Sequence, residues 1–175
     1  DLYAEELKAE GGVISGEQFV DECQVESDLE LLLPATYVTG SSERMLLYRE
    51  LDSLTLDKDV EDFRTRLIDR FGPIPSETEE LLRIVPLRRL AARLGAEKVF
   101  LKGGRMSLFF VSNPDSPYYQ SQAFGKVIAY MMKYTRRCDL REQNTRRSML
   151  VKDVKNVETA VSVLQEIVAM QVEEG

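Results

Sequence analysis

The sequence predicts an α+β fold, in which an N-terminal strand and helices are followed by two strand-strand-helix units that form an antiparallel sheet covered by helices. Two observations lead to this prediction. Apolar residues recur every three or four positions through residues 34–95, the period of an α-helix. Residues 96–172 contain two hairpin patterns, and a helical pattern follows each of them. We therefore expect one domain, residues 23–172, made of a helical half and a strand-strand-helix half.

Residues 1–22 are expected to lie outside that domain. The run DLYAEELKAEGG is typical of the last turns of an amphipathic helix that stops at Gly11 and Gly12, and a small, acidic stretch follows it. The chain begins with Asp1 rather than Met, so we interpret it as a piece of a longer protein. Residues 1–22 are then the tail of a preceding module and a linker.

Residues 23–34, CQVESDLELLLP, predict the first strand. Cys23, Val25 and Leu29 fall on one side of an extended chain, and acidic or amide side chains fall on the other. Because acidic residues are poor strand formers, burial of the apolar side must stabilise the strand. Pro34 closes it.

Two helices are expected between residues 41 and 72. Ser41 or Ser42 can cap the first, and Asp57 is the expected N-cap of the second. The second helix should end where Gly72 takes a left-handed conformation at the C′ position, because a proline follows directly.

A third helix is expected to begin at Ser76 and to end at Gly95. Ser76 and Glu79 have the spacing of a capping box, in which each side chain accepts a hydrogen bond from a backbone N–H at the helix start. Pro86 lies inside the helical pattern, where a proline removes one backbone hydrogen bond and costs about 3 kcal/mol in an ideal helix. We therefore expect a kink or a break at Pro86.

The second half should consist of two hairpins and two helices. The first hairpin turns at Gly103–Gly104, and the second turns near Asn144. Ser116 is the expected N-cap of a helix over residues 118–134, with Pro117 at its first position. Asn156 is the expected N-cap of the last helix.

The side chains needed for catalysis are missing or poorly placed. The sequence has no histidine, so the usual general base and the commonest zinc ligand are lacking. No phosphate-binding glycine motif occurs, and Gly103–Gly104 is a two-residue turn. Cys23 and Cys138 are isolated, which favours reduced, buried thiols in a cytoplasmic protein. We therefore expect no catalytic activity and no cofactor or metal in this domain.

Charge is distributed unevenly along the chain. Residues 1–80 hold 7 Lys and Arg against 21 Asp and Glu, a net charge of −14, whereas residues 81–175 hold 16 against 9, a net charge of +7. This asymmetry indicates a charged partner, or two halves that face each other. No apolar run approaches the roughly 18 residues that a membrane span needs, so we expect no membrane contact, and a monomer is the default.

Four arginines are candidate phosphate contacts: Arg88 and Arg89 on the third helix, and Arg146 and Arg147 on the second hairpin. The alternative is that they form a solvated face or pair with the acidic half. No interleaving of aromatic and basic residues of the RNA-recognition type is present. A basic nucleic-acid contact module of a DNA-repair helicase is therefore kept as the alternative function.

The sequence resembles the C-terminal domain of bacterial transcription-repair coupling factors from about Gln24 to Gly95. The strongest element of this resemblance is the run that surrounds Asp69. The residues that carry it are Leu33-Pro34-Ala35-x-Tyr37, Arg44, Tyr48-x-x-Leu51, Leu67-Ile68-Asp69-Arg70-Phe71-Gly72-x-x-Pro75 and Leu87-Arg88-x-x-Ala91-x-x-Leu94-Gly95. Beyond Ala96 only the order of the elements is similar.

The resemblance implies a role in DNA repair. It implies a parent protein that is an ATP-driven, superfamily 2 DNA translocase, which displaces stalled RNA polymerase and recruits the nucleotide-excision machinery. It also implies that this domain has no ATPase motif and docks on the N-terminal module of the same protein. That docking would hide the surface that recruits the damage-recognition subunit of the excinuclease, so the domain would be autoinhibitory. Residues 1–8 would end the motor module.

Asp69, with Arg66 and Arg70, is the expected interdomain latch. Asp69 falls in the last turn of its helix, where the helix dipole disfavours an anion, so no local reason explains its charge. It could instead pair with Arg66 or Arg70. The resemblance implies an acidic face before Asp69 that suits a basic partner, and Arg66 departs from that pattern.

Overall fold

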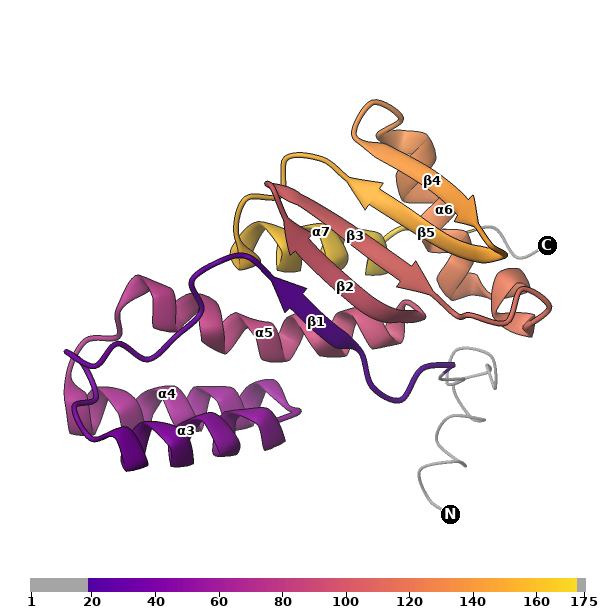
Figure 1. The fold of residues 1–175 in the computed structure, drawn as a ribbon. Coiled ribbons are helices and arrows are strands. Elements are labelled where there is room, and N and C mark those ends of the chain that lie inside the picture. Colours follow the sequence, from indigo (N-terminus) through magenta and orange to yellow (C-terminus); the bar gives the residue numbers. More distant parts are fainter. Residues whose placement is uncertain (1–18, 173–175) are drawn as a thin grey trace, which may run out of the picture.

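The computed structural model describes residues 19–172, which form a mixed five-stranded sheet and five α-helices (Figure 1). The elements in chain order are β1 (Gln24–Ser27), α3 (Ser41–Ser53), α4 (Asp57–Phe71), α5 (Ser76–Arg93), β2 (Ala96–Lys102), β3 (Arg105–Phe110), the 3-10 helix η1 (Pro117–Gln120), α6 (Gln122–Lys133), β4 (Cys138–Gln143), β5 (Arg146–Val151) and α7 (Val157–Val168). The predicted α+β class and the two strand-strand-helix units are confirmed. The predicted helix end in residues 1–18 lies outside the described residues.

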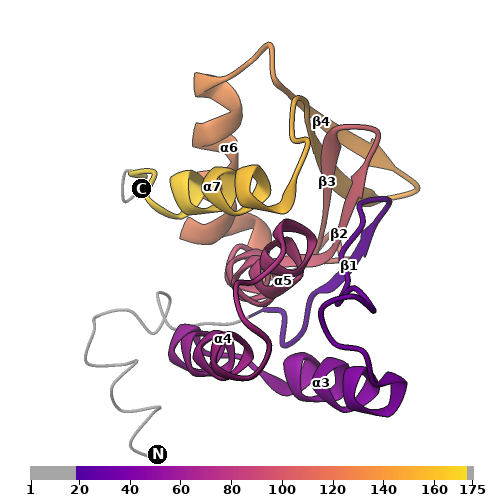
Figure 2. The same cartoon turned by 90° about the vertical axis from the view of Figure 1, so that its left-hand side faces the viewer.

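The strands lie in the order β1-β2-β3-β5-β4. All neighbouring pairs are antiparallel except β1 and β2, which are parallel. The four strands of the two strand-strand-helix units are therefore antiparallel, as predicted. β1 makes the whole sheet mixed, because the three helices between β1 and β2 return the chain to the same end of the sheet. Helices α5, α6 and α7 lie against one face of the sheet, and no element within residues 19–172 covers the other (Figure 2).

The first strand is shorter than the 12 residues predicted, because the chain leaves the sheet after Ser27. The backbone N–H of Leu29 donates to the Ser27 hydroxyl at 3.0 Å, which turns the chain. The Asp28 carboxylate accepts a hydrogen bond from the N–H of Gly103 at 2.9 Å. Leu29, Leu31 and Leu32, which follow, are half-buried and Leu33 is buried, although none of them belongs to a strand.

None of the predicted N-caps of the first three helices is correct. The capping positions are Gly40, Leu56 and Pro75, and none has a side-chain cap hydrogen bond. Asp57 is the first residue of α4 and pairs with Arg89 instead. Glu79 pairs with Arg64 instead of closing a capping box. These carboxylates are engaged by arginines from neighbouring helices, contacts that local spacing does not reveal.

Most of the other local predictions were confirmed. The hairpins turn at Gly103–Gly104 and at Asn144, all with positive φ. Gly72 ends α4 as predicted, but it is the C-cap and has φ +89° and ψ −164°, which differs from the predicted left-handed conformation. The Asn156 side chain accepts a hydrogen bond from the N–H of Thr159 at 2.7 Å, which caps α7. At Pro86 the predicted break is absent, since α5 continues through it as one helix, and the predicted alternative, a kink, stays a prediction.

The predicted helix over residues 118–134 is divided. Ser116 caps only the short 3-10 helix, in which Pro117 is the first residue. Ser121 then caps α6, accepting a hydrogen bond from the N–H of Phe124 at 3.3 Å. The division buries Tyr118, whose hydroxyl donates to the carbonyl of Leu94 at the end of α5.

The apolar core has two parts that meet along α5. The larger lies between the sheet and helices α5, α6 and α7, and includes Tyr118 and Tyr130, both fully buried. The smaller joins α3, α4 and the start of α5 around Phe63 and Leu82. Because α5 contributes to both parts, it couples the helical half to the sheet half. No helix within residues 19–172 has the length and apolar character to cross a membrane.

Candidate docking surface

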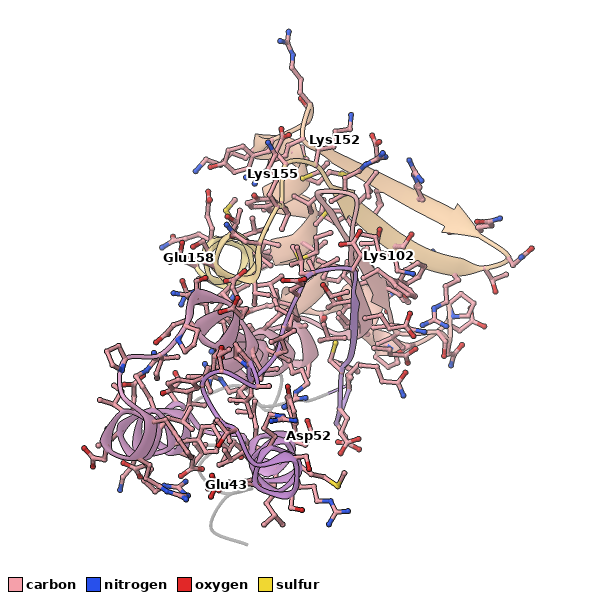
Figure 3. The ribbon with its side chains drawn as sticks, turned by 60° about the vertical axis from the view of Figure 1, so that its left-hand side comes forward. Glu43, Asp52, Lys102, Lys152, Lys155 and Glu158 are labelled. Carbon is pink, nitrogen blue, oxygen red and sulfur yellow. The ribbon has the colours of Figure 1, made fainter. Side chains whose placement is uncertain are left out.

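Helices α3 and α4 lie side by side at one end of the molecule, below α5 (Figure 1). Two ion pairs join them: Arg66 of α4 binds Glu50, and Arg70 of α4 binds Glu43. A later residue of α4 pairs with an earlier residue of α3, so the two helices run antiparallel. The pairs lie at the solvent-exposed edge of the hairpin, where Glu43 projects from α3 (Figure 3).

Arg66 is held by two hydrogen bonds and one ring. Its Nη1 donates to Oε1 of Glu50 at 3.2 Å, and its Nη2 donates to Oε2 of the same carboxylate. These bonds raise the pKa of Arg66 above its ordinary value. The guanidinium carbon lies 5.4 Å from the centroid of the Phe63 ring, so the side chain lies along α4 with little freedom to turn toward Asp69.

Arg70 has the same kind of environment one turn later. Its Nη2 donates to Oε2 of Glu43, and its guanidinium carbon lies 4.9 Å from the centroid of the Phe71 ring. Both arginine side chains remain more than half exposed, so each pair contributes at most about 1 kcal/mol to stability. The main effect of these ion pairs is to fix the positions of the two arginines, and their contribution to stability is small.

Asp69 is exposed and forms no hydrogen bond or ion pair with any residue from 19 to 172. Its two neighbouring arginines are engaged by Glu43 and Glu50, so the local pairing left open by the sequence does not occur. An anion in the last turn of α4 is disfavoured by the helix dipole. The carboxylate is therefore available to a cation on another surface.

An apolar side chain lies between the two glutamates. Leu46 is three residues after Glu43 and four before Glu50, so it shares their side of α3, and it is 63% exposed. We call the set made by Glu43, Leu46, Glu50, Arg66, Asp69 and Arg70 the docking face. It combines one exposed apolar contact with charged groups of both signs, and of these groups only Asp69 is unpaired within the described chain.

The four candidate phosphate contacts do not converge. Arg88 points from α5 toward the end of α3, with its Nη1 4.0 Å from Asp52, and Arg89 is bound to Asp57 at the start of α4. They line a cavity of about 590 Å³ that also contains Asp21, Glu22 and Asp52, so acids occupy the same walls.

Arg146 and Arg147 are successive residues of β5 and point to opposite faces of the sheet. Arg146 binds Glu97 and lies 5.7 Å from the Phe109 ring, whereas Arg147 binds Glu142 and lies 4.3 Å from the Tyr119 ring. Contact of these four arginines with nucleic acid stays a prediction.

The groups that could support other chemistry are buried or dispersed. Burial raises the pKa of the Cys23 thiol to about 12 and that of the Cys138 thiol to about 11, so neither is a reactive thiolate at neutral pH. Within residues 19–172, no group of three or more Cys, Asp or Glu is arranged to hold a metal ion.

Comparison with known proteins decides the family. The model of the TRCF domain family matches residues 27–121, more than half of the chain, and includes the whole docking face. This chain belongs to the TRCF domain family. The resemblance seen in the sequence is therefore confirmed, and with it the link to DNA repair and transcription-coupled repair.

Curated relatives carry the same description over more of the chain. The transcription-repair-coupling factor of Rickettsia bellii is 29% identical over 150 residues, which is 82% of this chain and 13% of that protein. The Escherichia coli K12 protein of the same description is 32% identical over 78 residues, 45% of this chain and 7% of that protein. The chain thus spans about an eighth or less of these curated relatives.

A solved structure shares the fold. The crystal structure of a C-terminal domain of transcription-repair coupling factor superposes with a TM-score of 0.64 at 17% identity, over 84% of this chain and 93% of that one. The match to the family model ends at residue 121, but the shared fold includes most of the second half.

The glutamates of the docking face were not among the predicted site residues. Glu43 and Glu50 are seven residues apart on α3, a spacing that places both on one side of a helix. That spacing, together with the four residues between Arg66 and Arg70, could have indicated two paired helices. Local spacing, however, does not show which helix faces which.

Proposed function

We propose that this chain is the non-catalytic C-terminal regulatory domain of a transcription-repair coupling factor. Residues 23–172 form the domain, and residues 1–22 connect it to the motor module. In the resting protein the domain docks on the N-terminal module and hides the surface that recruits the damage-recognition subunit of the excinuclease. The parent is an ATP-driven translocase that displaces stalled RNA polymerase from DNA in the cytoplasm.

The unpaired carboxylate of Asp69 is the observation that supports this proposal most. A surface acid in the last turn of a helix has no stabilising role in its own fold, and its two neighbouring cations are occupied by Glu43 and Glu50. A partner cation placed against Asp69 would meet a carboxylate that loses no internal contact on binding.

The composition of the docking face suits a reversible contact. Exposed ion pairs contribute little each and weaken with salt, so a face built from them can hold the resting state and still release. A large apolar interface would favour permanent association instead. Leu46 supplies one apolar contact at the centre of the charged groups. Release follows when movement of the motor module separates the two surfaces.

A binding titration tests the docking step. The chain is mixed with the separately produced N-terminal module of its parent, and the dissociation constant is measured by calorimetry at low and high salt. We expect binding that weakens as salt rises. Asp69→Lys should weaken it at least tenfold, because it replaces attraction by repulsion at the contact.

A matched control separates a local contact from overall charge. Asp115 is an exposed acid in the loop after β3, and Asp115→Lys makes the same charge change far from the docking face. It should leave the dissociation constant within about twofold. Absence of binding, or equal losses from the two substitutions, would reject the docking face.

A further inference from the structure

The sheet has an open face that the docking face does not include. Helices α5, α6 and α7 cover one side of the five strands, and the other side meets no element among residues 19–172 (Figure 2). Side chains alternate along each strand, so Met106 and Leu108 point to the helices whereas Ser107 and Phe109 point to the open face. The side chains at the outward-pointing positions of the central strands therefore determine the chemistry of the open face.

Two aromatic rings occupy the middle of the open face. Phe100 of β2 and Phe109 of β3 are half-buried, and their rings meet edge to face with centroids 5.4 Å apart. Ser107 lies directly across from Phe100, and Ser148 of β5 lies directly across from Phe109. A pair of half-exposed phenyl rings bordered by hydroxyl groups is suited to flat, polar-edged ligands.

Cations surround both rings. Lys98 Nζ and Lys102 Nζ lie 4.7 and 5.1 Å from the Phe100 centroid, and Arg146 lies 5.7 Å from the Phe109 centroid. Lys98, Phe100 and Lys102 therefore alternate along the open side of β2. Aromatic and basic residues thus alternate along β2 in a pattern other than the RNA-recognition type, and β3 and β5 supply the remaining ring and cations.

The open face is basic in a chain whose net charge is −7. Its five cations are Lys98, Lys102, Arg105, Arg141 and Arg146. Three acids meet three of them: Glu26 binds Lys98, Asp139 binds Arg141, and Glu97 binds Arg146. Lys102 and Arg105 form no ion pair with any residue from 19 to 172 and stand side by side at the β2–β3 turn.

The basic surface continues beyond that turn. The N–H of Val154 donates to the carbonyl of Gly104 at 2.8 Å and holds the β5–α7 loop against the turn. That loop carries Lys152 and Lys155, which are exposed and lie toward the end of the molecule opposite Glu43 and Asp52, and Lys102 lies between these two groups (Figure 3). Cations thus run from the rings to the β2–β3 turn and the β5–α7 loop, where Asp28, bound to the Gly103 N–H, and Asp153 are exposed acids.

We propose that the open face binds single-stranded nucleic acid. Phosphates would follow Lys102, Arg105 and the two lysines of the loop, and bases would stack against Phe100 and Phe109. Sequence-indifferent single-strand sites combine these two features, a cationic track and aromatic side chains. A duplex hides the faces of its bases inside the stack, so its phosphates would meet the cations but its bases would not reach the rings.

This inference is independent of the docking function. It uses the strands and the β5–α7 loop, whereas docking uses α3 and α4, and the two surfaces share no residue. Each can therefore fail without affecting the other.

The test is fluorescence anisotropy of the whole chain with labelled 20-mers of deoxythymidine and of uridine, with a 20-base-pair duplex and polyglutamate as competitors. We expect single strands to bind at 50 mM salt. Contact with about three phosphates should lower the affinity at least tenfold at 200 mM salt. The duplex and polyglutamate should compete at least tenfold less well than unlabelled single strand.

Two variants assign the binding to this face. Phe100→Leu keeps an apolar side chain in the sheet and should weaken single-strand binding about tenfold through lost stacking. Lys102→Glu with Arg105→Glu should weaken it further. The matched control is Arg49→Glu with Lys58→Glu, two exposed cations of α3 and α4, which should change the affinity less than twofold.

Three outcomes overturn the proposal. One is the absence of single-strand binding at 50 mM salt. Another is equal loss from the control pair, which would indicate attraction by overall charge. The third is unchanged binding by Phe100→Leu together with equal competition by polyglutamate, which would make the face a site for an acidic protein.

Discussion

Glu80 of α5 accepts a hydrogen bond from the backbone N–H of Val157, the first residue of α7, at 2.7 Å. The same carboxylate accepts the N–H of Glu158 at 3.0 Å. The first N–H groups of a helix have no partner inside the helix, so a carboxylate there acts as a cap. Here the cap comes from 77 residues earlier in the chain and joins the two halves.

Replacing Glu80 should therefore destabilise the whole domain. Glu80→Ala leaves two N–H groups of α7 without their acceptor and should lower the free energy of unfolding by about 1–2 kcal/mol. Urea denaturation followed by circular dichroism measures this. Glu61→Ala is the control, because it removes only an exposed pair with Arg64 and should cost less than about 0.5 kcal/mol. Equal costs for the two variants would contradict a capping role.

Gly95 should tolerate no side chain. It has φ +86°, and a Cβ there would lie 2.1 Å from the ring of the buried Tyr118. Gly95→Ala should cost about 3 kcal/mol or more, since it adds backbone strain to displacement of the ring. Gly103 also has positive φ but has nothing within 4 Å, so Gly103→Ala should cost about 1 kcal/mol. If the denaturation midpoints of Gly95→Ala and Gly103→Ala fall by the same amount, the Tyr118 ring can move to accommodate a Cβ at position 95.

The glutamates of the docking face should act through the arginines that they hold. Glu43→Ala releases Arg70, which can then pair with Asp69 and compete with the partner module. We expect at least threefold weaker docking, while the free energy of unfolding changes by less than about 1 kcal/mol. Calorimetric titration together with urea denaturation separates the two effects. If docking is unchanged or stronger in Glu43→Ala, Asp69 can bind its partner even when Arg70 is not held by Glu43.

The Cys23 thiol should be protected by folding. Burial raises its pKa from 9.0 to about 12, so between these values the folded state binds a proton that the unfolded state has lost. The stability associated with this group is complete below pH 9 and decreases as the pH rises toward 12. At pH 8, Ellman's reagent should modify the folded chain at least a hundredfold more slowly than the urea-unfolded chain. Equal rates would mean that the thiol is accessible.

The parts of the fold that depend on neighbours in sequence were predictable. The Gly103–Gly104 turn, the stop at Gly72 and the Asn156 cap each follow from one residue type in one conformation. The caps expected at Asp57 and Ser76 failed because Arg89 and Arg64 bind the acids concerned. Parallel pairing of β1 with β2 depends on residues about 74 apart, and no local pattern contains that information.

The candidate site was predicted in part. Resemblance to the family singled out Asp69 with Arg66 and Arg70, and the structure shows that the two arginines are held by α3. Glu43 and Glu50 could not be assigned, because that requires knowing that α3 lies antiparallel to α4. Lys98, Phe100 and Lys102 alternate on one strand, but the open face was missed because Phe109 and Arg146 join them only through strand pairing.

Recruitment of the damage-recognition subunit by the full-length parent tests the autoinhibitory role most directly. The measurement is the dissociation constant between the resting parent and that subunit, for the wild type, Asp69→Lys and the control Asp115→Lys. If the domain hides the recruiting surface, Asp69→Lys should tighten recruitment at least tenfold, and Asp115→Lys should leave it unchanged. Recruitment that is equally weak in all three proteins, with docking lost in Asp69→Lys, would contradict the account.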